Sequence, residues 1–130
     1  MRRRITLILA VAVSVALVAC GAPAEQASGV RTVSAAEAVE QLGGRTVIDV
    51  RTPAETAAGM LEGAVNIDIG SPDFQERIAS LDRDGSYLLY CRTGNRSAQA
   101  ASIMRDLGFT DVMDAGGFDS LVGAGAPIGP

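Results

Sequence analysis

Residues 86–109 read SYLLYCRTGNRSAQAASIMRDLGF, and this stretch changes character twice. Its first five residues form an apolar and aromatic run that is typical of a buried strand. From residue 97 onward, apolar side chains recur at helical spacing until Gly108, a residue that commonly ends a helix. We therefore expect a strand over residues 86–90, a helix over 97–109 and a tight loop between them.

The alternation of strand and helix patterns continues on both sides of this stretch. Short apolar or β-branched runs predict further strands at residues 30–33, 45–50, 64–68 and 110–115. Caps and proline-led starts predict helices that begin at residues 34, 52 and 71, with another short helix within 116–125 and a tail at 126–130. This order favours one α/β domain, with a mostly parallel central sheet of four to five strands and helices on both faces.

The composition excludes several kinds of site. A chain of 130 residues fits one domain. It has no histidine, which excludes Ser-His-Asp and Cys-His catalysis as well as histidine-ligated metals. Its two cysteines are too few for a thiolate-rich zinc site. We expect neither a metal nor a cofactor.

The amino-terminal segment has the pattern of an export signal. A basic MRRR segment precedes an apolar run that is short for a membrane span, which needs about 20 residues. Its last residues, Leu17-Val18-Ala19-Cys20, resemble the lipobox of bacterial lipoproteins, in which cleavage leaves a lipidated cysteine at the new terminus. We expect a signal peptide over residues 1–19, lipidation at Cys20, a flexible tether over 20–29 and a domain over 30–130. An ordinary signal peptide and an uncleaved anchor helix are the alternatives.

An exported and lipid-anchored chain has further consequences. The protein would lie on the extracytoplasmic side of a bacterial membrane, in the cell envelope. Loss of three arginines, from 11 basic against 15 acidic residues, leaves a formal charge of −7, which argues against a nucleic-acid partner. With Cys20 lipidated, Cys91 is the one free thiol. We expect a monomer.

The loop that follows the strand at residues 86–90 has the composition of an anion site. Gly94 and Asn95 tolerate positive φ, so the loop can turn successive backbone N–H groups inward. The expected helix adds its positive end, and Arg92 and Arg96 add formal charge. Thiols in such surroundings have pKa values of roughly 3.5–7.5. Cys91 is thus a candidate nucleophile that needs no histidine, although free cysteines at strand ends also occur as small buried hydrophobes.

The length of the loop separates two reactions. A thiolate here could carry either a phosphoryl group or a persulfide sulfur. Phosphatases with a cysteine nucleophile have a C-x5-R loop, whereas Cys91 and Arg96 have four residues between them. The tighter loop favours a single sulfur atom.

The segment CRTGNRSA (91–98), followed by an alanine-rich helix, resembles the active-site loop of rhodanese-type sulfurtransferases. The resemblance extends along the chain through VIDVRTPAE (47–55), GMLEGAVNI (59–67), DAGGFDSL (114–121) and the closing GAGAP (123–127). Three positions depart from the family pattern. Met60 replaces a usual histidine, Thr56 replaces an aromatic residue, and Leu121 replaces a frequent tryptophan, which leaves local packing and donor preference open.

The resemblance implies a role for each matched residue. Cys91 would be the nucleophile that becomes a persulfide, and Arg92 and Arg96 would favour an anionic donor such as thiosulfate. Asp49 and Arg51 would support the neighbouring strand end, either behind the site or as a structural ion pair, and Glu55 would be a helix-start residue. Backbone amides of the loop would hold the persulfide sulfur, from residues Arg92, Thr93, Gly94, Asn95, Arg96 and Ser97.

The resemblance also implies an activity: transfer of sulfane sulfur from a donor to Cys91 and then to a thiol or cyanide-like acceptor, by a ping-pong mechanism. A protein sulfur acceptor is a further option. Two alternatives remain open at this stage. One is a non-enzymatic sulfur-carrier or partner-binding module, and the other is a phosphatase or arsenate reductase of the same fold.

Overall fold

The computed structural model describes residues 29–130. The expected signal peptide, the expected lipidation site at Cys20 and the expected tether up to residue 28 lie outside the described residues. Within residues 29–130, no helix is both long and apolar enough to cross a membrane.

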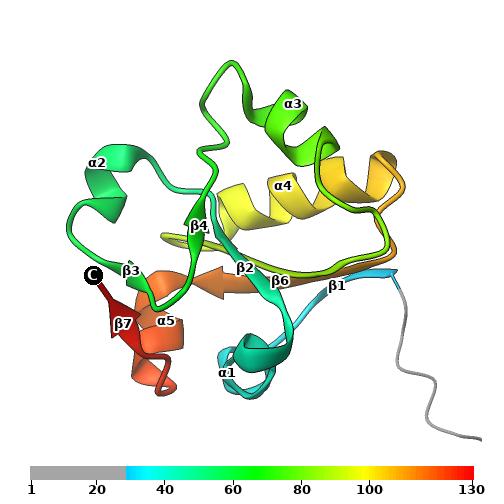
Figure 1. Ribbon diagram of the computed structural model, residues 1–130. Helices are drawn as coiled ribbons and strands as arrows, with labels where there is room; N and C mark the ends of the chain where they lie inside the picture. Colours follow the sequence, from blue (N-terminus) through cyan, green and yellow to red (C-terminus); the bar gives the residue numbers. More distant parts are fainter. Residues whose placement is uncertain (1–28) are drawn as a thin grey trace, which may run out of the picture.

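The centre of the domain is a five-stranded sheet in the order β1-β6-β5-β2-β4 (Figure 1). Every neighbouring pair in it is parallel, which confirms the predicted parallel α/β architecture. Side chains alternate between its two faces, as the pleat of a strand requires: Ile48 and Leu89 pack on one face, and Val47 and Leu88 on the other. The strands are β1 (Gly29–Thr32), β2 (Thr46–Asp49), β4 (Val65–Asn66), β5 (Ser86–Cys91) and β6 (Asp111–Gly117).

Helices cover both faces of the sheet. On one face, Phe74 and Ile78 of α3 (Phe74–Ala79) pack with Ala100 and Met104 of α4 (Asn95–Asp106). The other face is covered by α1 (Ala35–Gln41) and α5 (Phe118–Gly123), and a short 3-10 turn, η1 (Leu42–Gly44), follows α1. Figure 1 shows these two pairs of helices on opposite sides of the sheet, while α2 (Pro53–Thr56) lies beyond the end of β2.

Several expected bounds shift by a few residues, and two segments outside the loop differ in ways that change the description of the fold. The proline-led start at residue 71 does not begin the third helix: residues 71–73 form a turn, and α3 starts at Phe74. The expected tail at residues 126–130 contains β7 (Ile128–Gly129), which pairs antiparallel with β3 (Met60–Leu61). Local patterns missed this two-stranded sheet because a two-residue strand has no periodicity to detect.

The two ends of the parallel strands carry different parts of the chain. The carboxyl ends of the strands all lie at one end of the sheet, where β5 ends at Cys91 and β2 ends at Asp49. The amino end of β1, at Gly29, lies at the opposite end of the sheet, where the amino ends of the strands meet (Figure 1). The chain therefore enters the domain on the side opposite to Cys91.

Candidate active site

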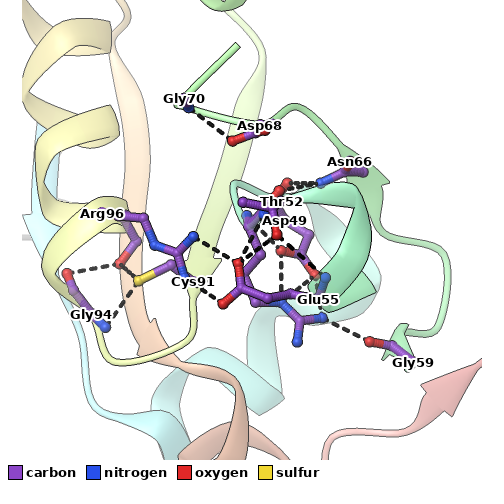
Figure 2. A network of polar contacts seen from close by, with 12 residues as sticks. Asp49, Thr52, Glu55, Gly59, Asn66, Asp68, Gly70, Cys91, Gly94 and Arg96 are labelled. Atoms are coloured by element: carbon purple, nitrogen blue, oxygen red, sulfur yellow. Dashed lines mark hydrogen bonds and ion pairs between the residues drawn. The ribbon is translucent and has the colours of Figure 1, made fainter. Parts of the chain in front are cut away.

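Cys91 is the last residue of β5, and its side chain is fully buried. The Gly94 amide donates a hydrogen bond to Sγ at 3.0 Å, and Ser97 Oγ lies 3.7 Å from the same sulfur. Figure 2 shows the sulfur enclosed by the turn that leads from β5 into α4. The structure therefore places the only free thiol of the described residues at the base of a loop whose amides point inward.

Glycines set the shape of this loop. Gly94 has φ 101°, a left-handed conformation that a side chain rarely adopts, and it is the N-cap of α4. The helix begins at Asn95, two residues earlier than expected, so the first amides of α4 lie close to the sulfur. A Cβ on Gly117 would lie 2.8 Å from the Arg92 carbonyl oxygen. The Gly116-Gly117 pair is thus the point where the end of β6 passes directly against the loop.

The environment of the thiol lowers its pKa. Burial alone raises the pKa of Cys91, because it removes water from the charged form. Hydrogen bonds from the backbone amides of Ser97, Gly94 and Thr93 stabilise the thiolate and bring the pKa below its ordinary value. The amides of the loop backbone, rather than the guanidinium groups, are therefore the main cause of the lowered pKa of Cys91.

Arg96 is paired with a carboxylate. Its Nη1 and Nη2 donate to Glu55 Oε2 and Oε1 at 2.8 and 2.7 Å (Figure 2). Glu55 also accepts from the Thr52 amide at 3.0 Å, which closes the capping box of α2. We expected Glu55 only as a helix-start residue and Arg96 as a charge open to substrate. The ion pair joins α2 to α4 and neutralises much of the Arg96 charge.

Arg92 differs from Arg96 in its surroundings. Its side chain is exposed, and it belongs to no ion pair among residues 29–130. An open pocket of about 440 Å³ adjoins it, lined by Arg51, Ala54, Glu55, Ala58, Arg92, Phe118 and Asp119. Arg92 is therefore the loop arginine available to an anion.

Asp49 and Arg51 form a buried ion pair behind the loop. Arg51 Nη2 donates to Asp49 Oδ2 at 2.6 Å and to the Gly59 carbonyl oxygen at 2.7 Å. The guanidinium also lies over the Phe118 ring, with Cζ 4.2 Å from the centroid. Asn66 Nδ2 donates to the carbonyl oxygens of both residues (Figure 2). The pair holds together the ends of β2, β4 and α5 and does not contact Sγ.

Ser97 connects the thiol to a residue that the sequence analysis missed. Its hydroxyl donates to Asp114 Oδ1 at 2.6 Å, and Asp114 is 5% exposed. The signal that could have revealed Asp114 is an acidic residue inside an apolar strand pattern, since buried carboxylates need specific partners. The other two loop residues, Thr93 and Asn95, are exposed.

The three departures from the family pattern occupy structural positions. Leu121 belongs to α5 and is fully buried in the core that α1 and α5 form with the sheet. Met60 lies in β3, opposite Gly129. Thr56 ends α2, where its hydroxyl donates to the Pro53 carbonyl oxygen at 3.1 Å. In the part of the chain that the structure describes, no three His, Cys, Asp or Glu side chains group as metal ligands would.

Comparison with known proteins agrees with this geometry. Residues 34–123 match the model of the rhodanese-like domain. The chain belongs to the rhodanese family. Thiosulfate sulfurtransferase PspE of Escherichia coli is 36% identical over 76 residues, which cover 57% of this chain and 71% of the relative. Thiosulfate sulfurtransferase GlpE of Pseudomonas putida is 40% identical over 78 residues, covering 58% and 68%.

Solved rhodanese structures share the fold. A rhodanese-related protein from Thermoplasma volcanium superposes with a TM-score of 0.68 at 35% identity, over 76% of this chain and 97% of that one. The rhodanese fold identified from the loop and its flanking motifs is therefore confirmed.

Proposed function

We propose that this protein is a rhodanese-type sulfurtransferase that carries sulfane sulfur as a persulfide on Cys91. The observation that carries the proposal is the contact between Sγ and the inward-facing loop amides, with Gly94 N at 3.0 Å. Preorganised N–H donors of this kind stabilise an anionic sulfur without reorganisation during the reaction. The names of the relatives, thiosulfate sulfurtransferases at 36–40% identity, support the same activity.

The first half-reaction begins with the Cys91 thiolate. It attacks the outer sulfur of a donor such as thiosulfate, forming a new S–S bond. The bond between that sulfur and the sulfonate breaks, and sulfite departs with the electron pair. Arg92, exposed at the pocket, would attract the dianionic donor.

The second half-reaction returns the enzyme to its starting state. A nucleophile, such as a thiolate or cyanide, attacks the outer sulfur of the persulfide, and the Cys91 thiolate is the leaving group. Two separate half-reactions on one nucleophile give ping-pong kinetics. Neither half-reaction requires a base, which is consistent with a chain that has no histidine.

The location of the enzyme is a further part of the proposal. The lipobox-like segment ending at Cys20 supports a lipid anchor, with the domain in the bacterial cell envelope outside the cytoplasm. The donor would then be a small anion of that compartment, and the acceptor a thiol or a partner protein.

The decisive experiment measures thiocyanate formation from thiosulfate and cyanide, with residues 21–130 and with the same chain carrying Cys91→Ser. We expect activity in the first and none in the second. Mass spectrometry after thiosulfate treatment should show one added sulfur on Cys91, removed by cyanide. If no donor, including polysulfide and a thiosulfonate, yields this adduct, the proposal is wrong, and Cys91-dependent hydrolysis of an aryl phosphate would favour the phosphatase alternative.

A further inference from the structure

Asp114 is a buried carboxylate that the proposed reaction does not use. It lies on β6 opposite Leu89 of β5, two residues before the nucleophile. Its Oδ1 accepts hydrogen bonds from Ser97 Oγ at 2.6 Å and from the Gly116 amide at 3.2 Å. Because Ser97 Oγ also lies 3.7 Å from Cys91 Sγ, the carboxylate is two hydrogen-bond lengths from the reacting sulfur.

No cation pairs with Asp114 among residues 29–130. Asp114 itself lines a cavity of about 120 Å³, together with Arg31 and Arg105 among other residues. Arg31 is paired with Glu37 at 2.6 Å, and Arg105 lies 3.7 Å from Asp106. The negative charge of Asp114 is therefore only partly offset from that side.

The charged groups around the thiol largely cancel one another. Glu55 neutralises Arg96, and Asp49 neutralises Arg51. Arg92 favours the thiolate, but its charge is exposed to solvent. Asp68 interacts with Arg96 at longer range. Among residues 29–130, Asp114 is the buried charged side chain that no salt bridge neutralises.

Ser97 has a single hydroxyl hydrogen and three acceptors near it. Asp114 Oδ1 lies at 2.6 Å, the Gly94 carbonyl oxygen at 3.0 Å and Cys91 Sγ at 3.7 Å. The ionised carboxylate, at the shortest distance, holds the hydrogen, since charge-assisted bonds are the strong ones. The hydroxyl can then offer the sulfur only a lone pair, which suits the thiol and not the thiolate.

We propose that Asp114 is a positioning residue that restrains the ionisation of Cys91, by holding the Ser97 hydrogen and by its own charge. The inference rests on the proposed role of Cys91 as nucleophile. The amides of the loop favour the thiolate, and Asp114 opposes them. The held Ser97 hydrogen and the negative charge of Asp114 both disfavour the thiolate form of Cys91.

This restraint would balance the two half-reactions. A thiolate is a stronger nucleophile when its thiol is less acidic, and a better leaving group when its thiol is more acidic. Cys91 is the nucleophile in the first half-reaction and the leaving group in the second. Without Asp114, the first step should slow at saturating pH while the second accelerates.

The test is the pH dependence of Cys91 alkylation by iodoacetamide, a neutral reagent, in the full chain with and without Asp114→Asn. We expect the midpoint pH of alkylation to fall by about one unit in the variant. The reason is that the removed charge lies two hydrogen-bond lengths from the sulfur in a partly screened interior. The plateau rate at high pH should fall about threefold for each unit by which the midpoint falls, following a Brønsted slope of roughly 0.4–0.5. A merely disordered site would do the opposite, with a midpoint that rises toward about 8.5 and a faster plateau.

The half-reactions give a second readout. Discharge of the preformed Cys91 persulfide by cyanide should be about threefold faster in Asp114→Asn, because Cys91 leaves more easily. A rate that is unchanged or slower would overturn the proposal. If even the unaltered protein forms no persulfide, the proposed function fails, whereas the alkylation profile still tests Asp114.

Two controls isolate the route of action. Asp111→Asn makes the same change at the other end of β6, where the carboxylate pairs with Arg45 at 2.7 Å, and it should leave the midpoint unchanged. In a Ser97→Ala background, Asp114→Asn should shift the midpoint less, because no hydroxyl hydrogen is released. A full shift in that background would overturn the role of Ser97.

A measurement without any change at position 114 covers the case in which the variant does not fold. Linkage is reciprocal, so ionisation of Cys91 must act back on Asp114. In the unaltered protein, the ¹³C resonance of the Asp114 carboxyl should move at the pH where Cys91 ionises, and Cys91→Ser should abolish that movement. A resonance that does not respond would overturn the proposal.

Discussion

Glu55 combines a local and a long-range role in one carboxylate. Its oxygens accept from the Thr52 amide, three residues away, and from the Arg96 guanidinium, 41 residues away. The local role follows from the capping-box spacing, whereas the long-range role follows only from the meeting of α2 and α4. The same side chain thus fixes the start of one helix and lowers the charge presented to substrate by another.

The Glu55 ion pair predicts a pH-dependent stability. Hydrogen bonds from Arg96, and then from the Thr52 amide, lower the pKa of Glu55 from 4.5 to about 2. Because the folded value is below the unfolded one, the stabilisation is complete above about pH 4.5 and is lost as the pH falls toward 2. Glu55→Gln should cost about 1–2 kcal/mol at pH 6, since the pair is partly open to solvent. Urea unfolding should show this difference shrinking at pH 3, and a difference independent of pH would contradict the assignment.

Asp49 predicts a larger and different effect. Removing it in Asp49→Ala would leave the Arg51 guanidinium, 5% exposed, without its counter-ion. Breaking a buried pair in this way costs about 3–5 kcal/mol. Chemical denaturation would measure the loss. Glu37→Gln is the matched control, because its pair with Arg31 is 34–44% exposed and should contribute under about 1 kcal/mol.

At the level of elements, the candidate active site is a junction between the ends of β5 and β6 and the start of α4. The register of the two strands shifts between Leu89 and Cys91, so that Cys91 comes opposite Gly117. Gly117 then passes under the Arg92 carbonyl with no room for a side chain. The shape of the loop therefore depends on a strand that follows it in the sequence by some 20 residues.

This junction predicts that Gly117→Ala harms activity more than stability. The new Cβ would lie 2.8 Å from the Arg92 carbonyl oxygen and would displace the loop backbone. Overpacking of this kind costs about 1–3 kcal/mol, whereas a displacement of about 1 Å can cost roughly 10²-fold in rate. Thermal unfolding and the thiocyanate assay together would measure both.

Gly123→Ala is the control for that substitution. Gly123 ends α5, and a Cβ there meets no atom within 4 Å. Both stability and activity should stay near those of the unaltered protein. Equal loss of activity in the two variants would show that the close approach at Gly117 is not the cause.

At the scale of the whole molecule, the parallel sheet separates the entry of the chain from the Cys91 sulfur. Gly29 begins β1 at the amino end of the parallel strands, and Cys91 ends β5 at their carboxyl end. The pocket beside Arg92 is lined by residues that follow the carboxyl ends of β2, β5 and β6, opposite the point at which the chain enters the domain, and we expect it to be turned away from the membrane if Cys20 is lipidated. A membrane would then not obstruct small donors or a soluble protein acceptor.

This arrangement predicts that anchoring leaves the kinetics nearly unchanged. The lipidated chain in zwitterionic vesicles and residues 21–130 in solution should have kcat/KM values for thiosulfate within about twofold, because the pocket lies at the carboxyl ends of the strands, opposite the entry of the chain at Gly29. The thiocyanate assay on matched protein concentrations would measure this. A loss of several-fold on vesicles would indicate that the pocket faces the bilayer.

The sequence by itself determined the fold class and identified the loop around the candidate nucleophile, Cys91. Strand and helix periods alternate along residues 30–115, and short-range spacing identified the loop between Cys91 and Ser97, its glycine and the helix that follows. These features depend on neighbours in the chain, so a local pattern contains them. The start of α2, with Thr52 as N-cap and Pro53 as the first helical residue, was predictable for the same reason.

Only the tertiary structure decided which charges and hydroxyls meet around the sulfur. The Arg96–Glu55 pair, the Ser97–Asp114 hydrogen bond and the β3–β7 sheet join residues far apart in sequence. A periodic pattern records which face a side chain occupies, but not its partner across the sheet. The partner depends on strand order and register, which arise when the hydrophobic faces are buried together.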